Sequence, residues 1–199
     1  SRLVWWEWDL QAQQLMTHTG GQSIFGYAGS VVPHTSDEWR NLIHPEDLER
    51  VKQSLESCLG GEVARWECQH RFLTRDGQWR WVVNKGKIAA RDSSGRPSRM
   101  LGTTQDVHER CLAEQELRKL NLAIERSPVM VMMTDLEGRI EYVNQQFTDV
   151  TGYAAGEVIG QNPRILKSER QVPSFYQELW QTLERGEVWT GHFFNQRGI

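Results

Sequence analysis

The sequence predicts a mixed α+β protein that contains two copies of one small domain, joined by a helix. Three observations support this fold class. Sequence anchors recur at a nearly constant offset, strand patterns flank a helical middle, and strong helix formers separate the two copies. The anchors, at offsets of 126, 126 and 125 positions, are Asp9-Leu10 with Asp135-Leu136, Gly26-Tyr27 with Gly152-Tyr153, and Gly61-Glu62-Val63 with Gly186-Glu187-Val188. Three anchors in the same order indicate a duplicated domain.

The composition excludes several classes of protein. The chain has 199 residues, 38% of them hydrophobic and 25% charged, with a net charge of -3 and no basic run. These values are typical of a globular chain and argue against a nucleic-acid partner or direct membrane contact. The three cysteines are odd in number and scattered, which favours a reducing compartment. We therefore expect a cytoplasmic location, either free or as the soluble part of a membrane-associated protein.

The first copy reads as two strands, a helical middle and three further strands. Pro45 suits the first position of the longer helix, and His44 before it is interpreted as a structural residue at the helix start. Asp76-Gly77 is a strong hairpin signal between the later strands. The predicted elements are strands at 5–10 and 13–18, a short helix after 35–37, a helix at 45–59, and strands at 62–74, from 79 and at 100–105.

Alternation along the strands predicts which side chains face the core. On the strand at 62–74 the buried set is Trp66, Cys68, His70 and Phe72, and the next strand is expected to continue it with Trp79, Trp81 and Val83. A single inward histidine such as His70 is interpreted as a hydrogen-bonded core residue rather than a ligand. The many tryptophans leave two alternatives open, a small-molecule pocket or a compact aromatic core.

The stretch between the copies predicts one helix. Asp106 is a suitable N-cap with Glu109 at the capping-box spacing, and Ser127-Pro128 marks the end. Apolar residues recur at spacings of four, three and four, the a/d pattern of a short coiled coil. These seam residues are Ala113, Leu117, Leu120 and Ile124. They suit either packing on the helix's own domain or a dimer interface.

The second copy restarts after Pro128 and stops early. It has a strand at 129–134, a turn, a strand at 139–143 and a helix at 173–185. Ile199 lies near the equivalent of Phe72, so we expect the last two strands to be missing. The predicted domains are residues 1–106, a connecting helix at 107–127, and an incomplete second domain at 128–199.

Both copies resemble PAS sensory domains. The residues that carry the resemblance in the first copy are Trp39, Leu42-Ile43-His44-Pro45-Glu46-Asp47, Arg75-Asp76-Gly77, Arg80-Trp81-Val82 and Gly102-Thr103-Thr104-Gln105-Asp106-Val107. In the second copy they are Thr134-Asp135, Gly138-Arg139-Ile140, Tyr142-Val143-Asn144, Thr151-Gly152-Tyr153 and Gly160-Gln161-Asn162-Pro163-Arg164. The resemblance implies a five-stranded antiparallel sheet with helices on one face. It also implies a regulatory rather than an enzymatic role, upstream of a histidine kinase, diguanylate cyclase or phosphodiesterase.

The second copy is similar to the PAS subgroup that includes flavin-binding redox sensors. That resemblance implies FAD or FMN as a candidate cofactor, with amides from Asn162 and Asn195 at the ring edge. Trp180 or Trp189 would supply an aromatic wall and Arg164 a phosphate contact. The alternative is that Trp180 is simply a core residue at helical spacing. Pro163 occupies the position of the reactive cysteine in light-sensing relatives, so adduct photochemistry is not expected.

These observations predict a sensory and dimerisation module of a larger signalling protein. It would sense a small ligand or a redox state and pass the signal through the connecting helix. A homodimer would form through that helix or through the sheet faces. The alternative is a ligand-free scaffold whose role is dimerisation alone.

Overall fold

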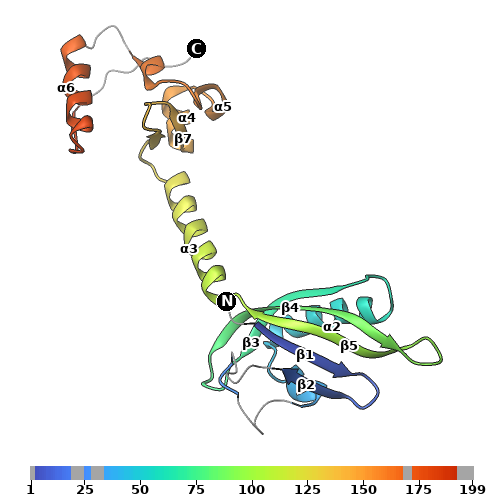
Figure 1. Ribbon diagram of the computed structural model, residues 1–199. Coiled ribbons are helices and arrows are strands. Elements are labelled where there is room, and N and C mark those ends of the chain that lie inside the picture. Colours follow the sequence, from blue (N-terminus) through green and yellow to red (C-terminus); the bar gives the residue numbers. More distant parts are fainter. Residues whose placement is uncertain (1–2, 19–24, 28–33, 168–171, 192–199) are drawn as a thin grey trace. The chain divides into compact units, whose positions relative to one another are not determined.

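The computed structural model describes residues 3–18, 25–27, 34–167 and 172–191 (Figure 1). The chain divides into two compact units, Ser1–Glu114 and Gln115–Ile199. Each unit combines strands with helices, so the predicted α+β class is confirmed.

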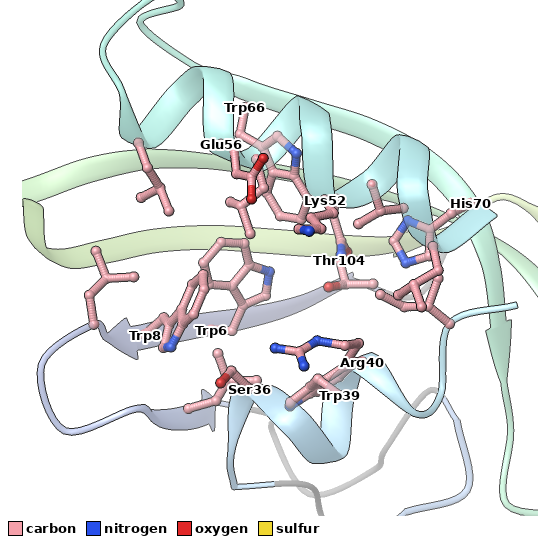
Figure 2. Close-up of a pocket in the computed structure, with 18 of the residues that line it drawn as sticks. Trp6, Trp8, Ser36, Trp39, Arg40, Lys52, Glu56, Trp66, His70 and Thr104 are labelled. Carbon is pink, nitrogen blue, oxygen red and sulfur yellow. The ribbon is translucent and has the colours of Figure 1, made fainter. Parts of the chain in front are cut away.

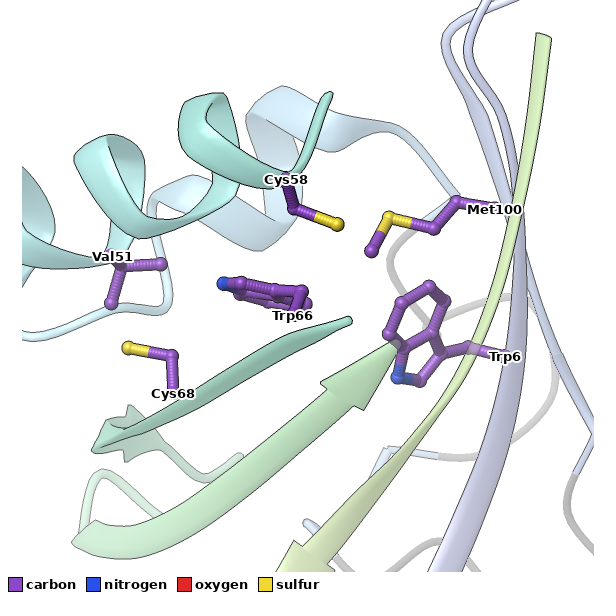
Figure 3. Packing of buried hydrophobic residues seen from close by; sticks show 6 residues of the cluster. All are labelled: Trp6, Val51, Cys58, Trp66, Cys68 and Met100. Atoms are coloured by element: carbon purple, nitrogen blue, oxygen red, sulfur yellow. The ribbon is translucent and has the colours of Figure 1, made fainter. Parts of the chain in front are cut away.

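The first unit is built on a five-stranded antiparallel sheet in the order β2-β1-β5-β4-β3. Its strands are β1 (Leu3–Asp9), β2 (Gln14–His18), β3 (Trp66–Leu73), β4 (Trp79–Arg91) and β5 (Pro97–Asp106). Helices α1 (Ser36–Arg40) and α2 (Pro45–Leu59) complete the unit. A buried cluster of Trp6, Val51, Cys58, Trp66, Cys68 and Met100 packs α2 onto one face of the sheet (Figure 3). We call this side of the sheet the inner face.

Local capping chemistry explains where both helices begin. At α1 the Thr35 side chain accepts from the Glu38 backbone N–H, and the Glu38 side chain bonds back to Thr35, which forms a capping box. At α2 the His44 ring accepts from the Glu46 backbone N–H at 3.2 Å, and Pro45 follows in the first helical turn. The structural role predicted for His44 is therefore confirmed.

The face predicted for β3 is correct, but the face predicted for β4 is wrong. Trp66, Cys68, His70 and Phe72 are all buried, as expected. The hairpin pairs Phe72 with Arg80 and His70 with Val82, so the even-numbered residues of β4 from Arg80 to Ile88 lie on the inner face. Trp79 is instead 37% exposed, and Val83 packs with Val107 and Cys111 in a separate cluster beside Trp81. Strand alternation is reliable within one strand, whereas the phase of the next strand depends on the turn that sets the register.

The second unit contains a small hairpin and several helices. The hairpin strands are β6 (Met132–Thr134) and β7 (Ile140–Val143), and the helices are α4 (Gln145–Thr151), α5 (Ala155–Val158), the 3₁₀ helix η2 (Pro163–Leu166) and α6 (Pro173–Glu184). Ile140, Val143, Phe147, Val158 and Leu166 form its buried core. The segment in which a third strand was expected includes 192–199, which lies outside the described residues.

The anchor glycines of the repeat have the same backbone conformation in both copies. Gly26 and Gly152 have φ of 77° and 80°, and Gly61 and Gly186 have φ of 86° and 71°. Only glycine adopts this left-handed region without a steric penalty. The matched glycines therefore mark equivalent chain reversals, as a duplicated domain requires.

The helix predicted between the copies is α3 (His108–Glu125). It begins two residues after Asp106, whose carboxylate accepts from the His108 backbone N–H at 3.0 Å. The Asp106 side chain therefore caps the first turn, but the predicted N-cap position is wrong, because the Val107 carbonyl accepts the first helical hydrogen bond, from the Cys111 backbone N–H at 2.9 Å. The predicted capping box with Glu109 is wrong, because the Glu109 side chain pairs instead with Arg80 at 3.4 Å.

Candidate ligand-binding site

A cavity of about 760 Å³ lies between the inner face of the sheet and helices α1 and α2 (Figure 2). Its apolar walls include Trp6, Trp8, Leu15, Trp39, Ile43, Leu48, Val51, Leu55, Leu59 and Trp66. Its polar lining includes Gln13, Ser36, Arg40, Glu49, Lys52, Glu56, His70, Asn84 and Thr104. A volume of this size and a mostly apolar lining are typical of sites for small organic molecules.

Two glycines on adjacent strands make room for the tryptophans. Trp66, Gly86, Gly102 and Trp6 form one row across β3, β4, β5 and β1. A Cβ atom at Gly102 would lie 2.1 Å from the Trp6 ring, and one at Gly86 would lie 2.7 Å from it. Because neither glycine carries a side chain, the Trp6 indole lies over the sheet and meets Trp66 edge-on, with centroids 6.1 Å apart. The aromatic wall of the cavity therefore depends on this row of four residues.

Three buried polar atoms of the cavity lining have no hydrogen-bond partner among the described residues. They are the indole nitrogen of Trp8, Nδ1 of His70 and Oδ1 of Asn84. Each such atom costs about 1–3 kcal/mol when it is buried without a partner. All three side chains line the same cavity, so a molecule bound there is well placed to recover this energy.

His70 is a neutral imidazole under ordinary conditions. Its side chain is 1% exposed, and this burial lowers the pKa of the ring to about 4, against the opposing influence of the Asp47 charge and the Cys68 backbone. The interpretation of His70 as a fully hydrogen-bonded core residue is wrong for its Nδ1 atom, which has no partner among the residues described.

An ion pair fixes the strand that carries His70. The Asp47 carboxylate accepts from the Arg71 backbone N–H at 2.9 Å and from its guanidinium at 2.9 and 3.1 Å. Burial on its own raises the pKa of Asp47, but the hydrogen bonds and the charge of Arg71 outweigh it and lower the pKa to about 2. The His44 backbone N–H also donates to the Arg71 carbonyl at 3.0 Å. The start of α2 is thus fastened to β3 beside the cavity.

The structure places the residues predicted for a flavin in two separate local settings. Asn162 caps η2, where its Oδ1 accepts from the backbone and side chain of Arg164 at 3.0 and 3.1 Å. Its Nδ2 donates to the Gly138 carbonyl at 3.2 Å. Trp189 packs edge-on against Phe175, with centroids 5.0 Å apart. The Trp180 side chain and Asn195 lie outside the described residues.

These contacts do not by themselves fit a flavin. Both acceptor positions of the Asn162 oxygen are used by Arg164, which leaves that oxygen no capacity for a ring edge. Arg164 would have to leave Asn162 before either residue met a cofactor. The flavin site therefore stays a prediction.

The sequence signal for the first cavity was only partial. The tryptophans indicated either a pocket or a core, and the structure shows that Trp6 and Trp66 serve both. Asn84 was missed because the predicted face of β4 had the opposite phase. A two-residue Asp76-Gly77 turn would have placed Lys85 opposite Cys68, whereas Thr74 pairs with Gln78 across a three-residue connection, which puts Asn84 there instead.

The described part of the chain lacks two further kinds of feature. No group of three or more histidine, cysteine, aspartate or glutamate side chains suited to a metal ion occurs there. Nor does that part contain a helix both long and apolar enough to span a membrane.

The chain matches two family models, both described as a PAS fold, at residues 18–104 and 118–197. It is 39% identical over 74 residues to a nitrogen fixation regulatory protein of Klebsiella oxytoca, a match that covers 37% of this chain and 15% of that protein. It is 29% identical over 150 residues to a biofilm dispersion protein of Pseudomonas aeruginosa, covering 74% of this chain and 34% of the relative. The chain thus spans well under half the length of these curated relatives.

A solved structure supports the same fold. A sensory box histidine kinase/response regulator from Burkholderia thailandensis aligns with a TM-score of 0.54 and 27% identity. The alignment covers 63% of this chain and 92% of that structure.

Proposed function

Because the chain belongs to the PAS-fold family and carries two such domains in tandem, we propose that it senses a small molecule in the cavity of its first domain. The sensory signalling role follows from the two matched domains, which are regulatory. The binding of a ligand, the formation of a dimer and the type of effector domain are the proposed parts. The single observation that carries it is the cavity with three unpartnered polar atoms.

Helix α3 is proposed to pass the signal on, because each of its ends is fixed to one domain. At its start Val107 and Cys111 pack on Val83 of β4, and Asp106 pairs with Arg80 at 2.9 Å. At its end the Asn144 side chain donates to the Ile124 carbonyl at 3.0 Å. Val83 is a neighbour of Asn84 in β4, so a shift of that strand on ligand binding would reach the first turn of α3.

We further propose that α3 forms a homodimer seam. Leu117 and Leu120 are 60% and 53% exposed, so these seam residues do not pack on their own domain. The outer sheet face, where Trp5 is 60% exposed, is the other candidate surface. The effector would be a histidine kinase, a diguanylate cyclase or a phosphodiesterase in the remainder of a longer protein. The second candidate function, a ligand-free dimerisation scaffold, rests on the same exposed leucines.

Filling the cavity tests the sensing proposal. Leu55 lines the cavity from α2, and Leu55→Trp would occupy part of its volume. Val63 is 45% exposed in the loop before β3 and is not among the cavity-lining residues, so Val63→Trp is the matched control. In the full-length protein, native mass spectrometry after gentle purification should show a bound small molecule in the wild type and in Val63→Trp. Leu55→Trp should lack it and should show a constant output. A full response in Leu55→Trp would favour the scaffold.

A further inference from the structure

We infer that the cavity of the first domain takes an elongated, planar molecule with an uncharged amide-like group at its His70 and Asn84 end and a hydrogen-bond acceptor at its Trp8 end. This inference rests on the proposed function, since it specifies the ligand class of the same cavity. It comes from the positions of the three unpartnered atoms and from the chemistry of the groups around them.

Strand register places the three polar side chains at two ends of the cavity. Asn84 pairs with Thr104, and Thr104 pairs with Val4, so these residues share one row across the sheet. Trp8 lies four residues beyond Val4 on the same strand, which is about 13 Å along the strand direction. Figure 2 likewise shows Trp8 and His70 on opposite sides of the cavity. A molecule that reaches both ends must therefore be elongated.

The inner end of the cavity is defined by His70 and Asn84. Asn84 pairs with Cys68, and His70 lies two residues further along β3, so the two side chains are diagonal neighbours on the inner face. The unpartnered Asn84 oxygen requires a donor. The neutral imidazole offers one donor and one acceptor, so it pairs with either half of an amide. A group that carries both an N–H and a carbonyl satisfies both residues at once.

An ion is disfavoured at this inner end. The nearby charged carboxylate, Asp47, already accepts three hydrogen bonds from Arg71 and lies 3.4 Å from Arg50. The residues that line the inner end, His70, Asn84 and Thr104, are all neutral. An ionised ligand group in contact with these three residues would lose its hydration without gaining a counter-charge from them.

The outer end requires an acceptor and favours a flat body. The indole N–H of Trp8 only donates, so its partner must be an ether, hydroxyl or carbonyl oxygen. Between the two ends lie the indole rings of Trp6 and Trp66, held over the glycine row. A planar aromatic body would gain stacking or edge contacts with these rings. Arg40, Lys52, Glu49 and Glu56 add both signs of charge to the cavity lining, so these charges as a set select no sign of ligand.

Four naphthalene probes separate these features on the complete chain. They are 6-methoxynaphthalene-2-carboxamide, 2-methoxynaphthalene without the amide, 2-naphthamide without the outer acceptor, and 6-methoxy-2-naphthoate with an ionised inner group. Binding is measured by isothermal titration. The complete probe should bind about tenfold or more tightly than each of the other three, because each of those leaves a buried group unpaired.

Two conservative variants assign the preferences to residues. Asn84→Leu keeps the side-chain size and removes the acceptor, so it should abolish the preference for the amide while 2-methoxynaphthalene binds as before. Trp8→Phe keeps the aromatic ring and removes the N–H, so it should abolish only the preference for the methoxy group. Asn84→Leu should also unfold at the same or a higher temperature than the wild type, because it removes an unpaired buried oxygen.

The outcomes distinguish the ligand class from the sensing function. If all four probes bound equally, or if the amide preference survived in Asn84→Leu, the proposed ligand class would be wrong. The proposal that the cavity binds a small molecule would still stand. Absence of binding by all four probes would also overturn the proposed ligand class. So would a marked loss of stability in Asn84→Leu, because it would mean that the Asn84 oxygen already has a partner such as ordered water. The sensing function itself fails only if Leu55→Trp leaves the output response intact.

Discussion

At the scale of single residues, His70 makes the stability of the first domain dependent on pH. Its folded-state pKa of about 4 lies below the ordinary value of 6.5. Between these values the unfolded chain binds more protons, so stability is complete above about pH 6.5 and falls as the pH drops toward 4. Denaturant unfolding at about pH 7 and about pH 4.5 should differ by about 2 kcal/mol more in the wild type than in His70→Gln. An equal difference in the two proteins would mean that folding does not lower the pKa of His70.

Asp47 gives a second residue-scale prediction. Its carboxylate is buried and bonded to both the backbone and the side chain of Arg71, so Asp47→Asn should lower the free energy of unfolding by about 3 kcal/mol. Glu46 pairs with the same guanidinium at 2.7 Å, but its side chain is 75% exposed. Glu46→Gln is therefore the matched control and should cost much less stability than Asp47→Asn. Similar losses in urea unfolding for the two variants would refute this ranking.

At the scale of structural elements, the glycine row of the sheet decides whether the cavity keeps its aromatic wall. A Cβ at Gly102 would meet both the Trp6 ring and the Lys85 carbonyl, at 2.1 and 2.3 Å. We expect Gly102→Ala to displace Trp6, to lower stability by about 1–3 kcal/mol, and to change the fluorescence of the buried indoles. Gly156 in α5 has open space around its Cβ position, so Gly156→Ala should be neutral or slightly stabilising. A Gly102→Ala variant with wild-type fluorescence and stability would show that Trp6 has another position available.

The proposed dimer seam of α3 can be tested by introducing charged residues into it. Leu117→Lys together with Leu120→Lys places four cations at a two-fold interface, so it should increase the fraction of monomer in sedimentation equilibrium. Leu122 is 51% exposed on the same helix but lies outside the a/d pattern. Leu122→Lys should therefore leave the association unchanged. If the double variant self-associates like the wild type, the outer sheet face becomes the better candidate interface.

The elements also show which sequence signals were sufficient to predict the start of a helix or the buried face of a strand. Helix starts at Thr35 and His44 follow from local capping, so they were predictable from a few residues. The inner face of β3 follows from alternation within one strand. The inner face of β4 depends on a hairpin register, which is set by hydrogen bonds across Thr74 and Gln78 rather than by the strand's own pattern. For that reason the sequence did not predict that Asn84 lies on the inner face.

At the scale of the whole molecule, duplication was the most informative signal. The repeat of anchors predicted two domains of one fold, and the matched left-handed glycines together with two family matches confirm it. The repeat could not predict the cavity of the first domain, because that cavity is lined by side chains of β1–β5, α1 and α2 that meet only after folding. Residues 162 and 164 were singled out by resemblance, yet the structure uses them first to cap η2.

Strand β4 has one further consequence, for the design of chimeric sensors. Val82 and Asn84 face the cavity side, whereas Trp81 and Val83 face the side where α3 begins. The residues proposed for ligand recognition and those proposed for signal transmission therefore alternate along four consecutive positions. Grafting the tetrapeptide 81–84 from another domain of this family would transplant both properties together, whereas exchanging alternate positions would separate them.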